Sequence, residues 1–91
     1  MSYFFYALKI KFNMNEKQLI NLKISEVAKI KQVNINDEKI KNQLYNLGFW
    51  VGEEIKLLNH NFNKETFLVK VMGINYAVDK KICEGIVVSG K

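Results

Sequence analysis

The residues that could do chemistry in this chain are few and lie far apart. There is one histidine, His60, and one cysteine, Cys83. A zinc or iron site needs several such ligands brought together, and a nucleophile needs a neighbouring base. We expect His60 to lie solvated at a hairpin tip and Cys83 to pack as a small apolar side chain on a short helix. The sequence therefore predicts no metal site and no nucleophilic centre.

Carboxylates and glycines give no catalytic pattern either. Glu53 and Glu54 are adjacent in a predicted strand, so their side chains should point to opposite faces and not act as an acid–base pair. The glycines are widely spaced and match neither a Walker loop nor a dinucleotide fingerprint. Their expected role is to allow positive φ at turns. The sequence indicates a protein that is not an enzyme and that needs no cofactor.

Length and composition indicate one small globular domain. A chain of 91 residues supports a single core, and 48% hydrophobic residues are enough to fill it. We expect this domain to span residues 16–91, after an extension over residues 1–15. A single cysteine cannot form an internal disulfide, so a reducing cytosol is the expected compartment.

The positive charge gives weak support for nucleic-acid binding. The formal charge of +5 comes from lysine alone, because the chain has no arginine. Recognition of bases and bidentate contacts with phosphate depend mainly on the arginine guanidinium group. Abundant asparagine and isoleucine accompany the lysines. An A/T-rich coding sequence would produce this combination, so base composition of the gene explains the positive charge without a nucleic-acid partner. We therefore expect no nucleic-acid partner.

The extension over residues 1–15 has two interpretations. Tyr3 to Leu8 is apolar but too short to span a membrane, so no direct membrane insertion is expected. Leu8, Ile10 and Phe12 alternate with lysines, which is typical of a half-buried strand on a sheet edge or on a subunit partner. A weak homo-oligomer therefore stays open. Alternatively, Met14 is the functional start.

The remaining sequence predicts short strands and two small helices. A strand over residues 26–35 is followed by Asn36, a predicted helix cap, and by an apolar stripe of Ile40, Leu44 and Leu47. Gly48 should end that helix. Further strands are predicted over residues 53–59, 66–72, 76–78 and 86–89, with a turn at 73–75 and a helical turn that starts at Asp79 and is released by Gly85. About five strands in this order favour a mainly β protein, a small barrel.

Three segments resemble the FeoA family. Residues 44–55 are similar to the segment of that family in which a helix ends in Leu-Gly and runs through an apolar residue into a charged strand. Residues 69–78, followed by 86–88, are similar to its closing pattern, and residues 22–33 to its opening strand. The resemblance covers about residues 19–89. Val51 stands where a proline is usual, and Ile24 and Ser25 stand where Pro-Gly often occurs.

The resemblance implies an SH3-like barrel in the cytosol, accessory to the membrane ferrous iron transporter FeoB. The implied partner is the cytosolic, GTPase-containing region of that transporter. The expected partner-binding residues are Phe49, Trp50, Val51 and Tyr76. Adjacent residues in an extended stretch face opposite ways, so we expect Phe49 in the core and Trp50 at the surface. The expected turn and cap residues are Asn36, Gly48, Gly52, Gly73, Asp79 and Gly85.

Two other functions fit a barrel of this size. One is a nucleic-acid-binding barrel, which would show a clustered basic face and strong salt dependence. The other is the regulatory barrel of metal-dependent repressors, although no DNA-binding helices precede it here.

Overall fold

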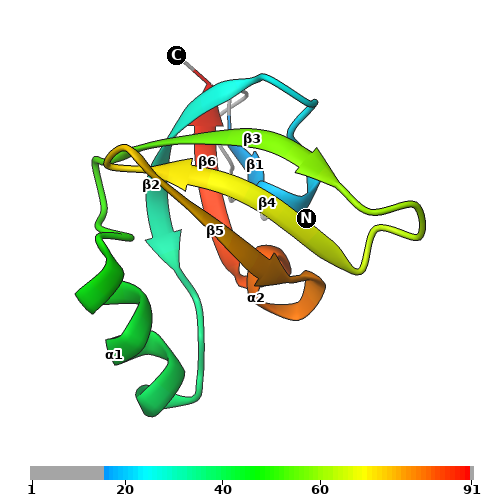
Figure 1. Cartoon of the computed structure of the whole chain (residues 1–91). Coiled ribbons are helices and arrows are strands. Elements are labelled where there is room, and N and C mark those ends of the chain that lie inside the picture. The colour runs from blue at the N-terminus through cyan, green and yellow to red at the C-terminus, as the bar shows by residue number, and fades with distance from the viewer. Residues whose placement is uncertain (1–15, 91) are drawn as a thin grey trace, which may run out of the picture.

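One antiparallel sheet forms most of the molecule (Figure 1). The computed structural model describes residues 16–90. The predicted strand over Leu8 to Phe12 and the alternative start at Met14 lie outside this range. In chain order the elements are β1 (Glu16–Gln18), η1 (Leu19–Asn21), β2 (Val27–Val33), α1 (Glu38–Leu47), β3 (Glu54–His60), β4 (Thr66–Val71), β5 (Ile74–Asp79), α2 (Lys80–Gly85) and β6 (Ile86–Gly90).

The sheet has the strand order β1-β6-β2-β3-β4-β5, and every neighbouring pair is antiparallel. The described residues thus form six strands, where the sequence predicted about five. The additional strand is β1, whose three residues are too few to show a period. Helix α2 contacts both edge strands, β1 and β5, and so closes the curled sheet. The prediction of a mainly β fold with two short helices is confirmed.

Alternation along the strands fills the core. In β4, Phe67, Val69 and Val71 are buried while Leu68 is exposed, which is the period of two expected of a strand with one buried face. In β2, Ala28 and Ile30 are buried and then Val33, because the pairing with β6 shifts between Ile30 and Gln32. This irregularity changes which parity faces inward. The largest fully buried side chains are Phe49, Phe67, Leu19, Ile30, Ile55, Leu57 and Ile86.

The cap of α1 differs by one residue from the prediction. Asp37, not Asn36, caps the helix, and its carboxylate accepts hydrogen bonds from the backbone N–H of Lys39 at 2.9 Å and Ile40 at 3.3 Å. The reason is the helix start at Glu38, since a cap side chain must reach the second and third N–H groups of the helix. Asp79 does stand at the cap position of α2, but its side chain makes no cap hydrogen bond.

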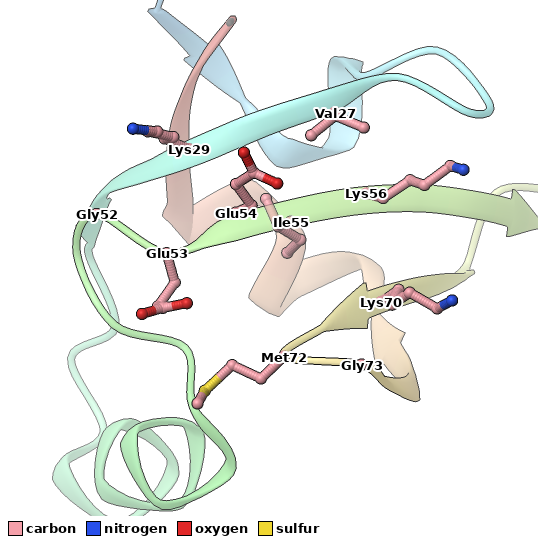
Figure 2. Close-up of a pocket in the computed structure, with 10 residues that line it drawn as sticks. All are labelled: Val27, Lys29, Gly52, Glu53, Glu54, Ile55, Lys56, Lys70, Met72 and Gly73. Carbon is pink, nitrogen blue, oxygen red and sulfur yellow. The ribbon is translucent and has the colours of Figure 1, made fainter.

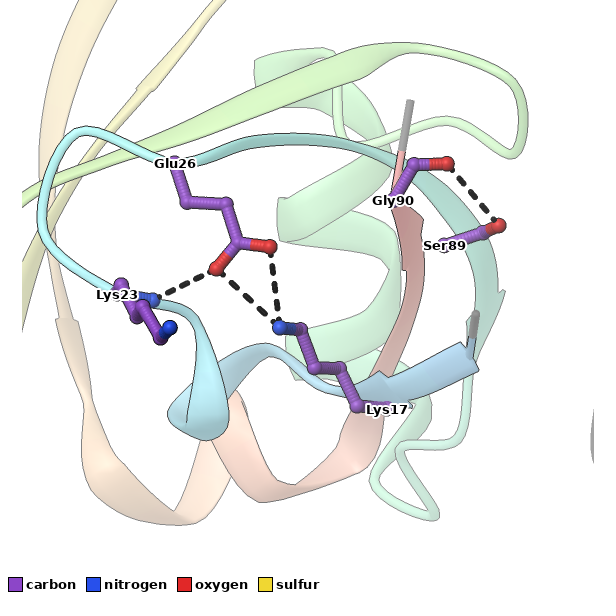
Figure 3. Close-up of polar contacts among 5 residues, drawn as sticks. All are labelled: Lys17, Lys23, Glu26, Ser89 and Gly90. Atoms are coloured by element: carbon purple, nitrogen blue, oxygen red, sulfur yellow. Dashed lines mark hydrogen bonds and ion pairs between the residues drawn. The ribbon is translucent and has the colours of Figure 1, made fainter. Parts of the chain in front are cut away.

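Glu26 joins β1 to the turn before β2 (Figure 3). Its carboxylate pairs with Lys17 Nζ at 3.0 Å and accepts the backbone N–H of Lys23 at 2.9 Å. The Lys23 N–H and then Lys17 lower the pKa of Glu26 from its ordinary value of 4.5. At the end of β6, Ser89 Oγ donates a hydrogen bond to Gly90 O at 3.5 Å (Figure 3).

We expect Glu26→Gln to lower the free energy of unfolding at neutral pH by about 0.5–1 kcal/mol, because a partly exposed ion pair is lost. A carboxylate with a lowered folded-state pKa stabilises the fold above its ordinary pKa, and this contribution disappears as the pH falls through the lowered value. Urea titrations at several pH values should therefore show the two proteins converging in acid. A gap that stays constant down to pH 2 would contradict this account.

Candidate functional site

The end of α1 directs two adjacent aromatic residues to opposite sides. Gly48 has φ 103°, and its N–H donates to the C=O groups of Leu44 and Tyr45. The N–H of Phe49 then donates to Leu44 O at 3.0 Å. This is the Schellman arrangement, in which the residue after the glycine also packs on the last helical turn. Phe49 is fully buried as a result.

The next turn carries Trp50 and Val51 at the surface. Glu53 N–H donates to Trp50 O at 3.0 Å across a turn in which Gly52 has φ 96°. Positive φ at the third residue is the mark of a type II turn and requires glycine or asparagine there. Trp50 is 48% exposed and its indole N–H donates to Tyr45 O at 2.6 Å. The expectation that Phe49 is core and Trp50 exposed is confirmed.

A second turn lies beside the first. Met72 and Gly73 have φ 51° and 81°, the two-residue type I′ turn, so β5 begins at Ile74 and not after a longer turn at 73–75. The Met72 side chain packs over Gly48, where a Cβ atom would meet its sulfur at 2.6 Å. The connection after α1 and the β4–β5 turn therefore touch.

Five exposed apolar side chains gather on these two turns and the end of α1. We call them the apolar patch: Leu47, Trp50, Val51, Met72 and Ile74, which are between 43% and 62% exposed. Trp50 and Val51 were expected at the surface. Leu47 was expected in the buried stripe of α1, but the helix ends at this residue and only the earlier Leu44 is buried. Met72 and Ile74 were not singled out.

Tyr76 supports the patch from beneath. Its ring centroid lies 5.6 Å from that of Phe49, and its hydroxyl donates to Leu47 O at 3.2 Å. Tyr76 is half-buried and also borders a hollow of about 230 Å³ between α1 and β5. These contacts fix the end of α1 on the sheet. Its expected role in partner binding stays a prediction, as it does for Trp50 and Val51, whereas Phe49 is fully buried and leaves no surface for a partner to contact.

Within residues 16–90, no three or more His, Cys, Asp or Glu side chains lie together in a group that could hold a metal ion. Cys83 is fully buried, and burial, followed by the charges of Asp79 and Glu84, raises its pKa to about 12. The thiol is thus protonated at neutral pH and a poor nucleophile or ligand. His60 is the last residue of β3 and not the hairpin tip; it is half-buried, with its ring 5.8 Å from Phe67 and Nδ1 2.9 Å from Asn61 O. Among the described helices, none is long and apolar enough to cross a membrane.

These features define a small antiparallel β-barrel that carries an exposed apolar patch. The FeoA domain model matches residues 17–90, and the chain belongs to the FeoA family. Members of this family are non-enzymatic accessory proteins of ferrous iron transport. A search of curated protein sequences gives no match.

Solved structures support the fold. The FeoA protein of Chlorobium tepidum superimposes with a TM-score of 0.76 at 23% identity, over 81% of this chain and 70% of that one. FeoA of Stenotrophomonas maltophilia, complexed with zinc and described as a prokaryotic SH3 domain protein, gives 0.71 at 25% identity, over 80% and 89%. The predicted SH3-like fold is confirmed.

A manganese-dependent transcriptional repressor shares the fold as well. It gives a TM-score of 0.76 at 10% identity, over 84% of this chain and 42% of the repressor. The regulatory barrel considered from sequence thus has the same architecture. At this identity the likeness concerns the fold alone.

Proposed function

We propose that this protein works in the cytosol and modulates ferrous iron uptake by docking on the cytosolic, GTPase-containing region of a FeoB-type transporter. The docking surface is the apolar patch. The observation that carries this proposal is the gathering of five large apolar side chains, 43–62% exposed, on two turns that touch. Exposed apolar groups of this kind mark sites of protein association.

The β4–β5 turn adds an energetic argument. Met72 adopts φ 51°, which costs a non-glycine residue about 1–2 kcal/mol, although asparagine or glycine would fit the turn at lower cost. Its side chain is 55% exposed. Strained backbone positions occur preferentially at functional sites. Ser25 and Lys64 also have positive φ, but they are polar and do not belong to the apolar patch. Methionine is also common on surfaces that bind other proteins.

The patch favours a protein partner over nucleic acid. Binding to single-stranded nucleic acid uses aromatic rings interleaved with basic groups along a groove. Here the patch is aliphatic except for Trp50, and the whole chain lacks arginine. Tryptophan is instead among the residue types that are enriched where a few side chains dominate protein–protein affinity.

Trp50→Ala is expected to weaken docking at least about tenfold, because truncation of a buried interface tryptophan usually costs more than 1.4 kcal/mol. The measurement is an amide-resolved NMR titration with the cytosolic region of the transporter from the same cell, with and without guanine nucleotide. The circular dichroism spectrum should stay nearly unchanged, since the side chain is half exposed and gives up one hydrogen bond.

Phe62→Ala is the matched control. Phe62 is fully exposed in the β3–β4 turn, away from the patch, so its removal deletes a surface aromatic without touching the proposed interface. This variant should bind like the wild type. Equal affinity of the Trp50→Ala variant and the wild type, or a flat titration of the wild type in every nucleotide state, would overturn the proposal.

A further inference from the structure

A basic hollow lies next to the apolar patch (Figure 2). It has a volume of about 480 Å³ and opens over the outer face of β2, β3 and β4. Lys29, Lys56 and Lys70 line it together with Met72, which also belongs to the apolar patch. A partner that covers Met72 therefore meets this hollow at the same time.

Two of the lysines stand directly opposite each other. The register pairs Lys56 of β3 with Lys70 of β4, whereas Lys29 of β2 is opposite Glu54. Figure 2 shows the side chains of Lys56 and Lys70 extending toward the same side. Like charges that face each other across neighbouring strands destabilise a sheet. This arrangement therefore has a cost for the fold.

A bulge creates that arrangement. Before the bulge, Leu57 pairs with Val69. After it, Asn59 pairs with Leu68 and His60 with Phe67. Leu58 between them is therefore left without a partner on β4. If the register of the pairs Asn59–Leu68 and His60–Phe67 continued along β3, the residue opposite Lys56 would be Val71 and not Lys70. Bulges occur preferentially where a strand must redirect its side chains, often beside functional sites.

The two ammonium groups have no counter-charge within 4 Å among residues 16–90, where Lys17 and Glu26 form the ion pair. Lys56 is half-buried, so solvent screens its charge less than that of an exposed lysine. A carboxylate placed between Lys56 and Lys70 would remove the repulsion and form two charge-assisted hydrogen bonds. Among residues 16–90, no carboxylate forms an ion pair with Lys56 or Lys70, although Glu53 and Glu54 also line the hollow.

We propose that this hollow receives an acidic segment of the docking partner, with a carboxylate seated between Lys56 and Lys70 while adjacent apolar residues cover Met72. This inference rests on the proposed function. A protein carboxylate fits better than a phosphate backbone because Glu53 and Glu54 line the same hollow and would repel a continuous run of phosphates. A single acidic side chain avoids that repulsion.

The test uses the double variant Lys56→Gln/Lys70→Gln in the titration with the transporter region. Its affinity should fall about tenfold at low salt and less than about twofold near 0.5 M salt, where screening weakens the wild type as well. The loss caused by Trp50→Ala should persist at both salt concentrations. The double variant should be at least as stable as the wild type, because it removes a like-charge pair.

Lys39→Gln/Lys81→Gln is the control of equal charge, since both residues are exposed on the helices α1 and α2 and neither lines the hollow. It should bind almost as tightly as the wild type. If the Lys56/Lys70 variant binds like this control while Trp50→Ala is weakened, the basic hollow is not an acidic-segment site and the proposed docking stands.

The hollow can also be tested without the transporter, which separates its failure from failure of the docking. A short capped peptide with one glutamate flanked by leucines, titrated into the full-length protein, should shift the backbone amide resonances of residues 56 and 70, and the double variant should abolish those shifts. Equal shifts at all lysines would overturn the inference. Tighter binding of short single-stranded DNA than of this peptide at the same residues would overturn it as well, in favour of a nucleic-acid site.

Discussion

Replacement of Phe49 by alanine is expected to lower the free energy of unfolding by about 3–5 kcal/mol, the usual cost of removing a large buried aromatic side chain. Phe49 is fully buried, its ring lies 5.6 Å from that of Tyr76, and its N–H closes the end of α1. Domains are stable by about 5–15 kcal/mol in total, so the variant should be marginal at body temperature.

Urea unfolding followed by circular dichroism measures this loss, and Trp50→Ala is the built-in control. The two residues are neighbours in sequence, but Trp50 is 48% exposed and should cost less than about 1.5 kcal/mol, mainly for its hydrogen bond to Tyr45 O. Phe49→Leu, which keeps most of the apolar volume, should fall between Phe49→Ala and the wild type. A Phe49→Ala variant as stable as Trp50→Ala would show that Phe49 does not hold α1 on the sheet.

This contrast was predictable from the sequence because it is local. Gly48 ends the helix, and in the extended stretch that follows, side chains alternate between core and solvent. The same alternation explains why Phe67, Val69 and Val71 of β4 are buried together. Local rules also left an error of one residue at the helix cap, because Asn36 and Asp37 are equally good cap types and the exact start of α1 decides between them.

The rest of the candidate site depends on contacts between distant segments. Met72 reaches the apolar patch because it packs over Gly48, and nothing in either segment alone indicates that contact. Leu47 lies on the apolar stripe of α1 and becomes exposed only because the helix ends there. The opposition of Lys56 and Lys70 requires the bulge at Leu58, and a bulge changes pairing without changing the pattern of residue types.

The role of Gly85 also depends on a contact with a distant segment, and a substitution can test it. Its expected role was to release the chain into the last strand after a helical turn, as a glycine that permits positive φ. Instead Gly85 is the last residue of α2, and its φ is not among the positive values, which belong to Gly48, Gly52 and Gly73. Glycine is required there by space: an added Cβ atom would lie 2.7 Å from Asn34 O and 2.7 Å from Ile35 Cδ1.

We therefore expect Gly85→Ala to lower the free energy of unfolding by about 1–3 kcal/mol, the range for an overpacked site. The Ile35 side chain can rotate away from the added methyl group, but Asn34 O is a backbone atom and cannot. The N–H of Asn34 also donates to Gly85 O at 2.7 Å. The connection from β2 to α1 must therefore shift. Amide shifts near Asn34 and urea unfolding report both effects. Gly90→Ala is the control, since a Cβ atom there meets nothing within 4 Å. Equal stability of the two variants would mean that the contact between α2 and the end of β2 yields without cost.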